Sequence, residues 1–182
     1  ALAAALGLDF DELDPADRAR FVERTQLFAR EAQARRRLRL RLHESMPWID
    51  LPASRRDGSV DATLPLPTRV VGRDLADGAT LAFDLAAGVR RFAGRAQVHG
   101  GEGLSVVSDI DDTIKHTQVR DRRQMLANTF VRPFTAVPGM SAWYARIAAA
   151  QPTAFHFVSS GPWALASALE AFVSEHAFPP AS

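Results

Sequence analysis

A short apolar run that ends in closely spaced acids constrains this chain more than any other feature of its sequence. Leu104, Val106 and Val107 are followed directly by the letters SDIDDT, residues 108–113. Near-continuous apolar runs are typical of parallel strands in α/β proteins, and such proteins place ligands and chemistry at the carboxyl ends of these strands. The run therefore predicts a strand that ends at Asp109, with a functional site where it ends.

The two acids Asp109 and Asp111 suit chemistry on a phosphate. Alternation along an extended segment turns both carboxylates to one side and Ile110 to the other. Magnesium prefers oxygen ligands and is usually held by one or two carboxylates and by phosphate oxygens, so we expect Asp109 and Asp111 to bind Mg²⁺. One aspartate can attack phosphorus while the other protonates the leaving group and then activates water. The plain alternative is an acidic turn after a core strand.

Three sequence blocks resemble a known superfamily and a narrower family within it. Asp109, Asp111 and Thr113 match the Asp-x-Asp-x-Thr signature of haloacid-dehalogenase-like phosphatases. The blocks SDIDDTIK, PGM and FHFVSSGPW resemble the catalytic domain of the actin-patch-associated phosphatidate phosphatase and its bacterial relatives; they occupy residues 108–115, 138–140 and 155–163. The resemblance is close from about residue 103 to residue 180 and weaker before it.

The resemblance implies a magnesium-dependent hydrolase that works through an aspartyl-phosphate. Asp109 would be the nucleophile and Asp111 the acid and then the base. The implied reaction converts phosphatidate to diacylglycerol and phosphate. A soluble phosphomonoester as substrate is the second hypothesis, and a binding or scaffold module without catalysis is the third.

Phosphate also needs donors, and a second block offers them. Ser159 follows an apolar strand, and Ser160 leads through Gly161 and Pro162 into a helix, whose free amides would add to an anion site. Taken alone, such a loop is more often a helix cap. The resemblance gives Ser159 the role of binding the transferring phosphoryl group, and Ser160 a supporting one.

Three residues near the first acids have less defined roles. Thr113 belongs to the first motif, and we group it with the phosphate-binding residues. Lys115 lies close enough in sequence to contact a phosphate, although an exposed loop lysine is equally plausible. Asp112 is either a supporting acid or a turn cap.

The superfamily's later motifs are missing from this sequence. No lysine follows Lys115 and no aspartate follows Asp121. The resemblance requires a basic residue and an acidic pair downstream of Ser159. We therefore expect a truncated catalytic domain, residues 101–182, that is inactive by itself.

Two further segments precede that domain. Asp14 and Pro15 form a good helix start, which predicts a helical leader over residues 1–36 with its helix running to about Arg36. Alternation at residues 38–43 and turn signals between later apolar segments predict a small antiparallel β-sandwich over residues 37–100. The other strands are expected at residues 60–66, 69–75, 80–85 and 91–98.

The order of elements after residue 103 indicates an α/β fold. We expect an irregular or partly helical insert over residues 116–135, helices at 140–149 and 162–176, and a second strand at 154–158. Strands that alternate with helices pair in parallel. The fold class is therefore an N-terminal helix and a β-sandwich, followed by the first half of a Rossmann-like domain.

Composition limits the partners. A net charge of +1 over 182 residues argues against a protein dominated by nucleic-acid contacts, and the absence of cysteine excludes disulfides and thiolate sites. No window is long and apolar enough to span a bilayer. The densest basic cluster, residues 35–41, is either a solvated helix end or a surface that attracts anionic lipid. We expect a cytoplasmic or peripheral membrane location.

Overall fold

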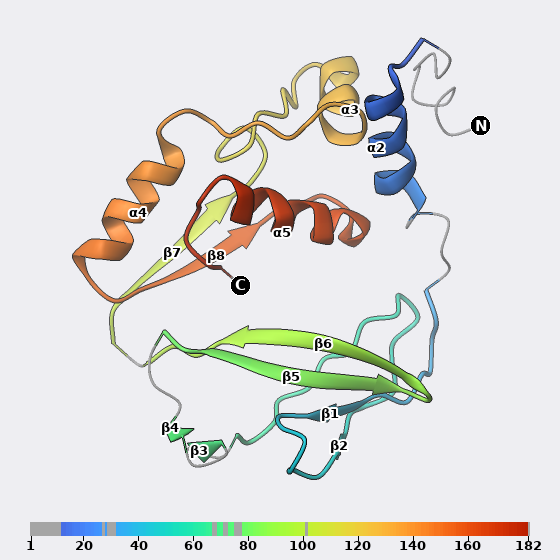
Figure 1. The fold of residues 1–182 in the computed structure, drawn as a ribbon, viewed down its shortest axis with the longest axis vertical. Coiled ribbons are helices and arrows are strands. Elements are labelled where there is room, and N and C mark those ends of the chain that lie inside the picture. Colours follow the sequence, from blue (N-terminus) through green and yellow to red (C-terminus); the bar gives the residue numbers. More distant parts are fainter. Residues whose placement is uncertain are drawn as a thin grey trace. The chain divides into compact units, whose positions relative to one another are not determined.

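The computed structural model describes residues 12–26, 28, 32–66, 69–70, 73–74, 78–100 and 102–181. The chain divides into two compact units. The first consists of residues 1–30, which include helix α2 (Pro15–Gln26), and residues 103–182, and the second consists of residues 31–102. Figure 1 shows the elements of each unit.

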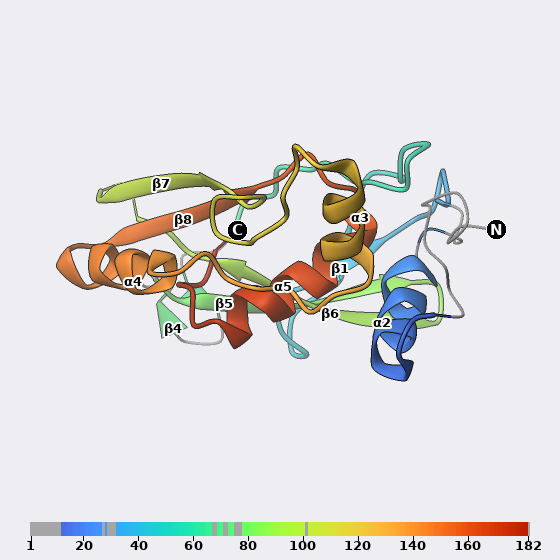
Figure 2. The same ribbon diagram turned by 90° about the horizontal axis from the view of Figure 1, so that it is seen from above.

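Two parallel strands organise the first unit. Strand β7 (Leu104–Asp109) pairs with β8 (Thr153–Val158) in a register that sets Asp109 opposite Val158. The parallel pairing expected from the sequence is thus confirmed. Along the chain, α2 precedes these strands, α3 (Arg122–Phe130) and α4 (Met140–Ala150) lie between them, and the 3₁₀ turn η2 (Trp163–Leu165) and α5 (Ala166–Glu175) follow them. Figure 2 shows the four α-helices and the two strands from another side.

Local sequence explains where the two helices between these strands begin. The Asp121 side chain accepts hydrogen bonds from the backbone N–H groups of Arg123 and Gln124, which caps the first turn of α3. Helix α4 begins after Gly139, whose φ of 82° is a left-handed conformation that glycine adopts readily. The alanines of α4 then favour the helix. The insert is therefore partly helical, as expected.

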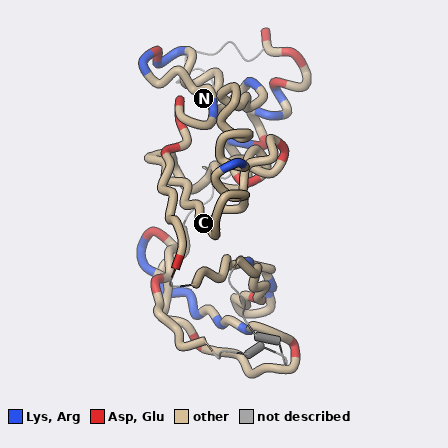
Figure 3. The backbone as a smooth tube through the Cα atoms, turned by 90° about the vertical axis from the view of Figure 1, so that its left-hand side faces the viewer, with Lys and Arg blue, Asp and Glu red and all other residues tan. Residues whose placement is uncertain are grey.

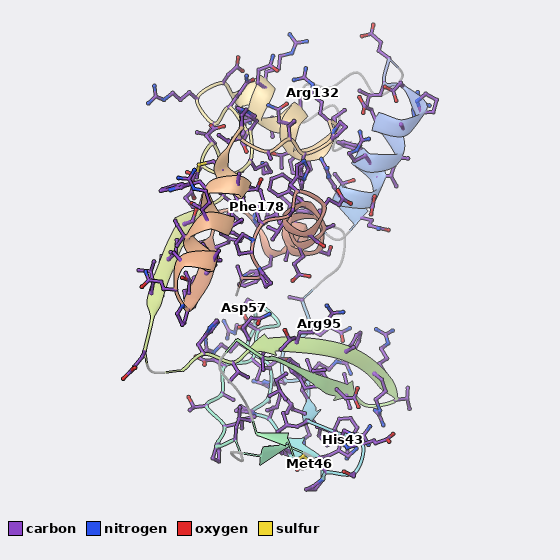
Figure 4. The ribbon with its side chains drawn as sticks, turned by 60° about the vertical axis from the view of Figure 1, so that its left-hand side comes forward. His43, Met46, Asp57, Arg95, Arg132 and Phe178 are labelled. Carbon is purple, nitrogen blue, oxygen red and sulfur yellow. The ribbon has the colours of Figure 1, made fainter. Side chains whose placement is uncertain are left out.

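An aromatic core lies behind the strand ends of this unit. Its buried members are Ile110, Ile114, Tyr144, Phe155, Phe172 and Phe178, the last of which is labelled in Figure 4. Several of the rings meet edge to face or tilted, arrangements worth about 0.5–1.5 kcal/mol each beyond burial. Ile110 is buried in this core while Asp109 is exposed, so the predicted alternation around Ile110 is confirmed.

Helix α2 is held against the C-terminal end of α3 by two arginines. Arg20 Nη1 donates to the carbonyl of Val131 at 2.6 Å, and Arg24 Nη1 donates to the carbonyls of Thr129 at 3.0 Å and Arg132 at 2.8 Å. The last carbonyls of a helix have no partner within it, so these guanidiniums satisfy them. Burial, helped by the charge of Arg20, lowers the pKa of Arg24 to about 10.

The expected length of this helix was wrong. Helix α2 ends at Gln26, and residues 32–38 are not helical. The backbone N–H of Arg35 donates to the carbonyl of Ser54, the N–H of Arg36 donates to the Ser54 hydroxyl, and the N–H of Ser54 donates back to the carbonyl of Arg36. These bonds to a distant residue replace helical ones, and the sequence pattern gives no sign of them.

The second unit contains an antiparallel sheet of four strands in the order β2-β1-β5-β6. The strands are β1 (Arg39–Arg41), β2 (Ile49–Asp50), β5 (Thr80–Ala87) and β6 (Arg90–Gln97). Leu42 and Leu81 form a small core with Leu40, Met46, Phe83 and Val98. The strands expected at residues 38–43, 80–85 and 91–98 are therefore confirmed, although β1 is shorter than its pattern.

Two other strand predictions in this unit need correction. Residues 60–66 contain no strand, and Pro65 within them cannot donate a backbone hydrogen bond to a ladder. Residues 69–74 hold two short paired strands, β3 (Arg69–Val70) and β4 (Arg73–Asp74), where one was expected; Leu75 lies outside the described residues. The antiparallel character is confirmed, and a sandwich of two packed sheets stays a prediction.

None of the helices in the described ranges combines the length and the apolar character needed to cross a bilayer.

Candidate active site

The end of β7 is fixed from behind by the core. The hydroxyl of Tyr144, a buried residue of α4, donates to Ser108 Oγ at 2.8 Å, and Ser108 Oγ donates to the carbonyl of Asp109 at 2.8 Å. In front, the N–H of Ile110 donates to the carbonyl of Val158 at 3.2 Å, which continues the pairing with β8. The backbone that carries Asp109 is therefore held on two sides.

The Asp109 side chain itself is exposed and lightly bonded. Thr113 Oγ1 donates to its Oδ2 at 3.4 Å, a long hydrogen bond. Its carboxylate is therefore accessible to a ligand that approaches the strand end. Thr113 therefore lies beside Asp109, and its assignment to the phosphate-binding residues stays a prediction.

Asp111 differs from Asp109, because its carboxylate accepts hydrogen bonds from three side chains. Lys115 Nζ is 2.9 Å and Thr117 Oγ1 is 2.6 Å from its Oδ1, while Ser159 Oγ donates to its Oδ2 at 3.1 Å. Partial burial by itself would raise the pKa of Asp111, but the hydrogen bonds from Thr117, Lys115 and Ser159 and the lysine charge outweigh it and lower that pKa below its usual value. Asp111 is therefore ionised at neutral pH.

Lys115 is not the exposed loop lysine that the sequence left open. Its side chain is 2% exposed, its ammonium group lies between Asp111 and Thr117, and it stands 4.9 Å from the centre of the Phe134 ring. A buried ammonium needs compensating partners. Lys115 therefore neutralises Asp111 directly, and its contact with phosphate stays a prediction.

Asp112 is a turn cap, one of the two alternatives that the sequence offered. Its Oδ1 accepts from the backbone N–H groups of Thr117 and Gln118, both at 2.7 Å, and its Oδ2 accepts from that of Val119 at 2.8 Å. Slight desolvation would raise the pKa of Asp112, but these three bonds and the charge of Lys115 lower it. We call residues 109–119 the acidic loop. Asp112 connects the two halves of this loop through these three hydrogen bonds.

The residues after β8 form a second loop, residues 159–163, which we call the serine loop. Ser159 Oγ accepts from the N–H of Gly161 at 2.9 Å while it donates to Asp111. Ser160, assigned a supporting role, is exposed between them, and among the described residues we find no hydrogen bond from its side chain. The structure thus joins the two loops through Ser159 and Asp111, which lie far apart in the sequence.

The carboxylates differ in their suitability for a metal. Among the described residues, no group of three or more His, Cys, Asp or Glu side chains could hold a metal ion. Both oxygens of Asp111 already accept hydrogen bonds, and the cation Lys115 lies beside it. The exposed carboxylate of Asp109 fits the mode in which magnesium takes one carboxylate and completes its shell with water and phosphate.

Two residues of this site were not predicted from the sequence. Thr117 is 2% exposed and connects Lys115 to Asp111, and Asn128 of α3 donates to the Thr117 carbonyl at 3.1 Å. The spacing of Lys115 and Thr117, two residues apart after the motif, was a usable signal, because extended residues two apart face one side. Asn128 had no comparable signal.

Comparison with known proteins identifies this part of the chain. Residues 104–182 match the family model described as "Phosphatidate phosphatase APP1, catalytic domain". This segment belongs to the APP1 catalytic-domain family. The APP1 phosphatidate phosphatase of Saccharomyces cerevisiae is 36% identical over 81 residues, which are 43% of this chain and 14% of that protein.

A second relative gives a similar match. An uncharacterized protein of Schizosaccharomyces pombe is 31% identical over 94 residues, which cover 50% of this chain and 15% of that protein. The matches therefore span about one seventh of the length of these curated relatives. No solved structure matches the chain significantly.

Proposed function

We propose that this chain carries the nucleophile loop and the phosphate loop of a magnesium-dependent, haloacid-dehalogenase-like phosphatase that hydrolyses phosphatidate to diacylglycerol and phosphate. Membership of residues 104–182 in the APP1 catalytic-domain family supports a phosphatase role. The observation that carries the proposal is the meeting of the acidic and serine loops, with Ser159 Oγ at 3.1 Å from Asp111 Oδ2.

The proposed first step is attack by Asp109. A carboxylate oxygen of Asp109 forms a bond to phosphorus, and the bond from phosphorus to the leaving oxygen breaks. Asp109 suits this step because its side chain is exposed and accepts one long hydrogen bond. Ser159 and the N–H groups at the start of the following helical turn would orient the phosphoryl oxygens.

Asp111 would supply and then remove a proton. Because Asp111 is a carboxylate before the reaction, it must first take a proton from the substrate phosphate, whose second pKa is about 6. It then gives this proton to the leaving alkoxide. In the second step Asp111 takes a proton from water as that water attacks phosphorus and releases Asp109. Lys115 and Thr117 hold Asp111 in place for both transfers.

Magnesium fits the exposed carboxylate of Asp109. When bound, it would neutralise negative charge on the phosphoryl group during transfer. Phosphate monoesters are among the slowest substances to hydrolyse without a catalyst, so both covalent attack and charge neutralisation are useful.

Phosphate release by the full-length gene product tests the proposal. Phosphatidate vesicles and p-nitrophenyl phosphate are compared, each with Mg²⁺ and with EDTA. We expect faster release from phosphatidate and loss of release in EDTA. Faster release from the soluble ester favours the soluble substrate, and no release from either favours a binding module.

Trapping at Asp109 supplies a second readout on the full-length gene product. Beryllofluoride mimics a phosphoryl group on a carboxylate, and ¹⁹F NMR detects it when bound. We expect a bound signal with Mg²⁺ and none for Asp109→Asn. Equal signals from both proteins would contradict the assignment of the nucleophile.

A further inference from the structure

The second unit carries a group of arginines around one tryptophan. The Cζ atoms of Arg39, Arg41 and Arg91 lie 5.5, 4.5 and 5.0 Å from the centre of the Trp48 ring. Arg39 and Arg41 come from β1, Arg91 from β6, and Trp48 precedes β2. Cations over an indole face are attracted by its quadrupole, so the ring holds three like charges close together.

Strand register places these residues on one face of the four-stranded sheet. Arg39 pairs with Ala86, and Ala86 pairs with Arg91, so the three form a row across β1, β5 and β6. Two residues along, Arg41 pairs with Asp84; further on, Ala82 pairs with Arg95. We call this surface the arginine face. Leu40, Leu42, Leu81 and Phe83 occupy the other face, which forms the small core.

Positive charge exceeds negative charge on the arginine face. Its register positions include four arginines and two aspartates: Arg39, Arg41, Arg91 and Arg95, with Asp50 and Asp84. Arg41 already pairs with Asp84 at 2.8 Å. Figure 3 marks the basic residues of this unit in blue. Arg39 and Arg91 lie over Trp48, where Arg91 Nη1 also donates to the carbonyls of Gly88 and Arg90. Each guanidinium has further N–H groups that can bind an anion.

The hairpin between β5 and β6 adds an apolar tip to this charge. Val89 is 96% exposed at the turn, and Arg90 and Arg91 follow it directly. Exposed apolar residues next to arginine suit the interface of a bilayer, where tryptophan is also enriched at the level of the headgroups. An acidic peptide would account for the charge but not for the exposed Val89.

We propose that the arginine face docks the protein on an anionic lipid surface, with guanidiniums on headgroup phosphates and Trp48 at the headgroup level. Arginine binds phosphate oxygens through two parallel hydrogen bonds, which a lysine cannot do. The inference goes beyond the phosphatase proposal, because it concerns another unit of the chain and holds whether or not the enzyme assay succeeds.

Vesicle co-sedimentation of the 182-residue chain tests this docking. Vesicles of equal parts phosphatidylglycerol and phosphatidylcholine are compared with phosphatidylcholine alone, because phosphatidylglycerol is not the proposed substrate. We expect binding to the anionic vesicles that weakens between 0.1 M and 1 M salt, where the Debye length falls from about 10 Å to about 3 Å. Equal binding to both vesicles would overturn the proposal.

Two variants with equal charge loss separate the face from general basicity. Arg39→Gln with Arg91→Gln removes two charges beside Trp48, and should weaken binding about 30-fold at about 1 kcal/mol per basic residue. Arg36→Gln with Arg37→Gln removes two exposed arginines from the same basic cluster of the sequence, outside the face, and should change binding less than threefold. Equal losses in both variants would contradict a specific face.

The indole reports its own surroundings. In a protein with Trp143→Phe and Trp163→Phe, both exposed positions, Trp48 is the remaining tryptophan. Its fluorescence emission should shift to shorter wavelengths when anionic vesicles are added. Acrylamide should then quench this fluorescence less strongly. Unchanged emission from vesicle-bound protein would contradict docking through this face. In a competition experiment, release of the protein from the vesicles by polyglutamate of equal total charge would contradict the lipid proposal and favour an acidic polypeptide partner.

Discussion

The acidic loop and the serine loop meet at one site, but they are built differently. In the acidic loop, Asp112 closes three backbone hydrogen bonds and Lys115 is buried beneath the chain. In the serine loop, every residue from 159 to 163 is exposed, and Ser159 accepts one internal bond, from Gly161. The chain thus holds Asp111 and Asp112 through several hydrogen bonds, while the Asp109 side chain and the serine loop are exposed.

This difference suits the proposed chemistry. Catalysis gains most when the attacking group and its proton partner are held before the substrate arrives. A phosphate-binding loop must admit the ligand, so it can be more open. We therefore expect the acidic loop to carry most of the order and the chemistry of the site.

Removal of the nucleophile should have the largest effect. Asp109→Asn should lower phosphatase turnover of the full-length protein by about 10⁴-fold or more, because a residue that forms the covalent intermediate cannot be replaced by its amide. Its stability should change little, because the side chain is exposed. Steady-state kinetics and thermal unfolding measure the two effects. Substantial turnover in a pure Asp109→Asn sample would remove Asp109 from this role.

Loss of Asp111 should destabilise the acidic loop. Asp111→Ala leaves the buried ammonium of Lys115 without its counter-charge, and should lower the unfolding free energy by about 2–3 kcal/mol. Chemical denaturation of the 182-residue chain measures it. The matched control is Asp111→Ala with Lys115→Met, which removes both charges and should recover part of the loss. If the double variant is the less stable of the two, Lys115 has another partner.

The cap of the acidic loop should matter less. Asp112→Asn keeps one acceptor oxygen but turns an N–H donor toward one of the three backbone donors, so it should cost about 1–2 kcal/mol of unfolding free energy. The same denaturation experiment measures it. A change below about 0.3 kcal/mol would mean that the loop does not depend on its cap.

The cap also predicts a dependence on pH. The pKa of Asp112 is lowered in the folded protein, so the unfolded chain takes up protons first as the pH falls below about 4. The stability that this carboxylate contributes is present above that range and is lost as the pH falls toward the folded pKa. The difference between the wild-type chain and Asp112→Asn should therefore shrink between pH 6 and pH 3. A constant difference would contradict this linkage.

The smallest effect is expected in the serine loop. Ser159→Ala removes one exposed hydroxyl, so the unfolding free energy should change by about 0.5 kcal/mol or less. Chemical denaturation of the Ser159→Ala and Asp112→Asn variants under the same conditions compares the contributions of the two loops to the unfolding free energy. A loss as large as that of Asp112→Asn would show that the serine loop is as rigid as the acidic one.

The sequence by itself determined the local features of the site. The apolar run set the end of a parallel strand at Asp109, and alternation turned Ile110 into the core and the acids away from it. The alanines of α4 likewise favoured a helix close to its expected position, and Asp121 caps α3 inside the insert that was expected to be irregular or partly helical. These features depend on neighbours in the chain, which a sequence pattern displays.

Only the tertiary structure decided the features that depend on distant partners. It buried Lys115 beside Asp111 and Phe134, ended α2 at Gln26 and held that helix on the carbonyls of α3 through Arg24. It also gathered arginines of β1 and β6 around Trp48, dividing a basic cluster that looked continuous. The physical reason is that a charge or a hydrogen-bonding group takes the partner that folding brings near it, and periodicity carries no record of partners far along the chain.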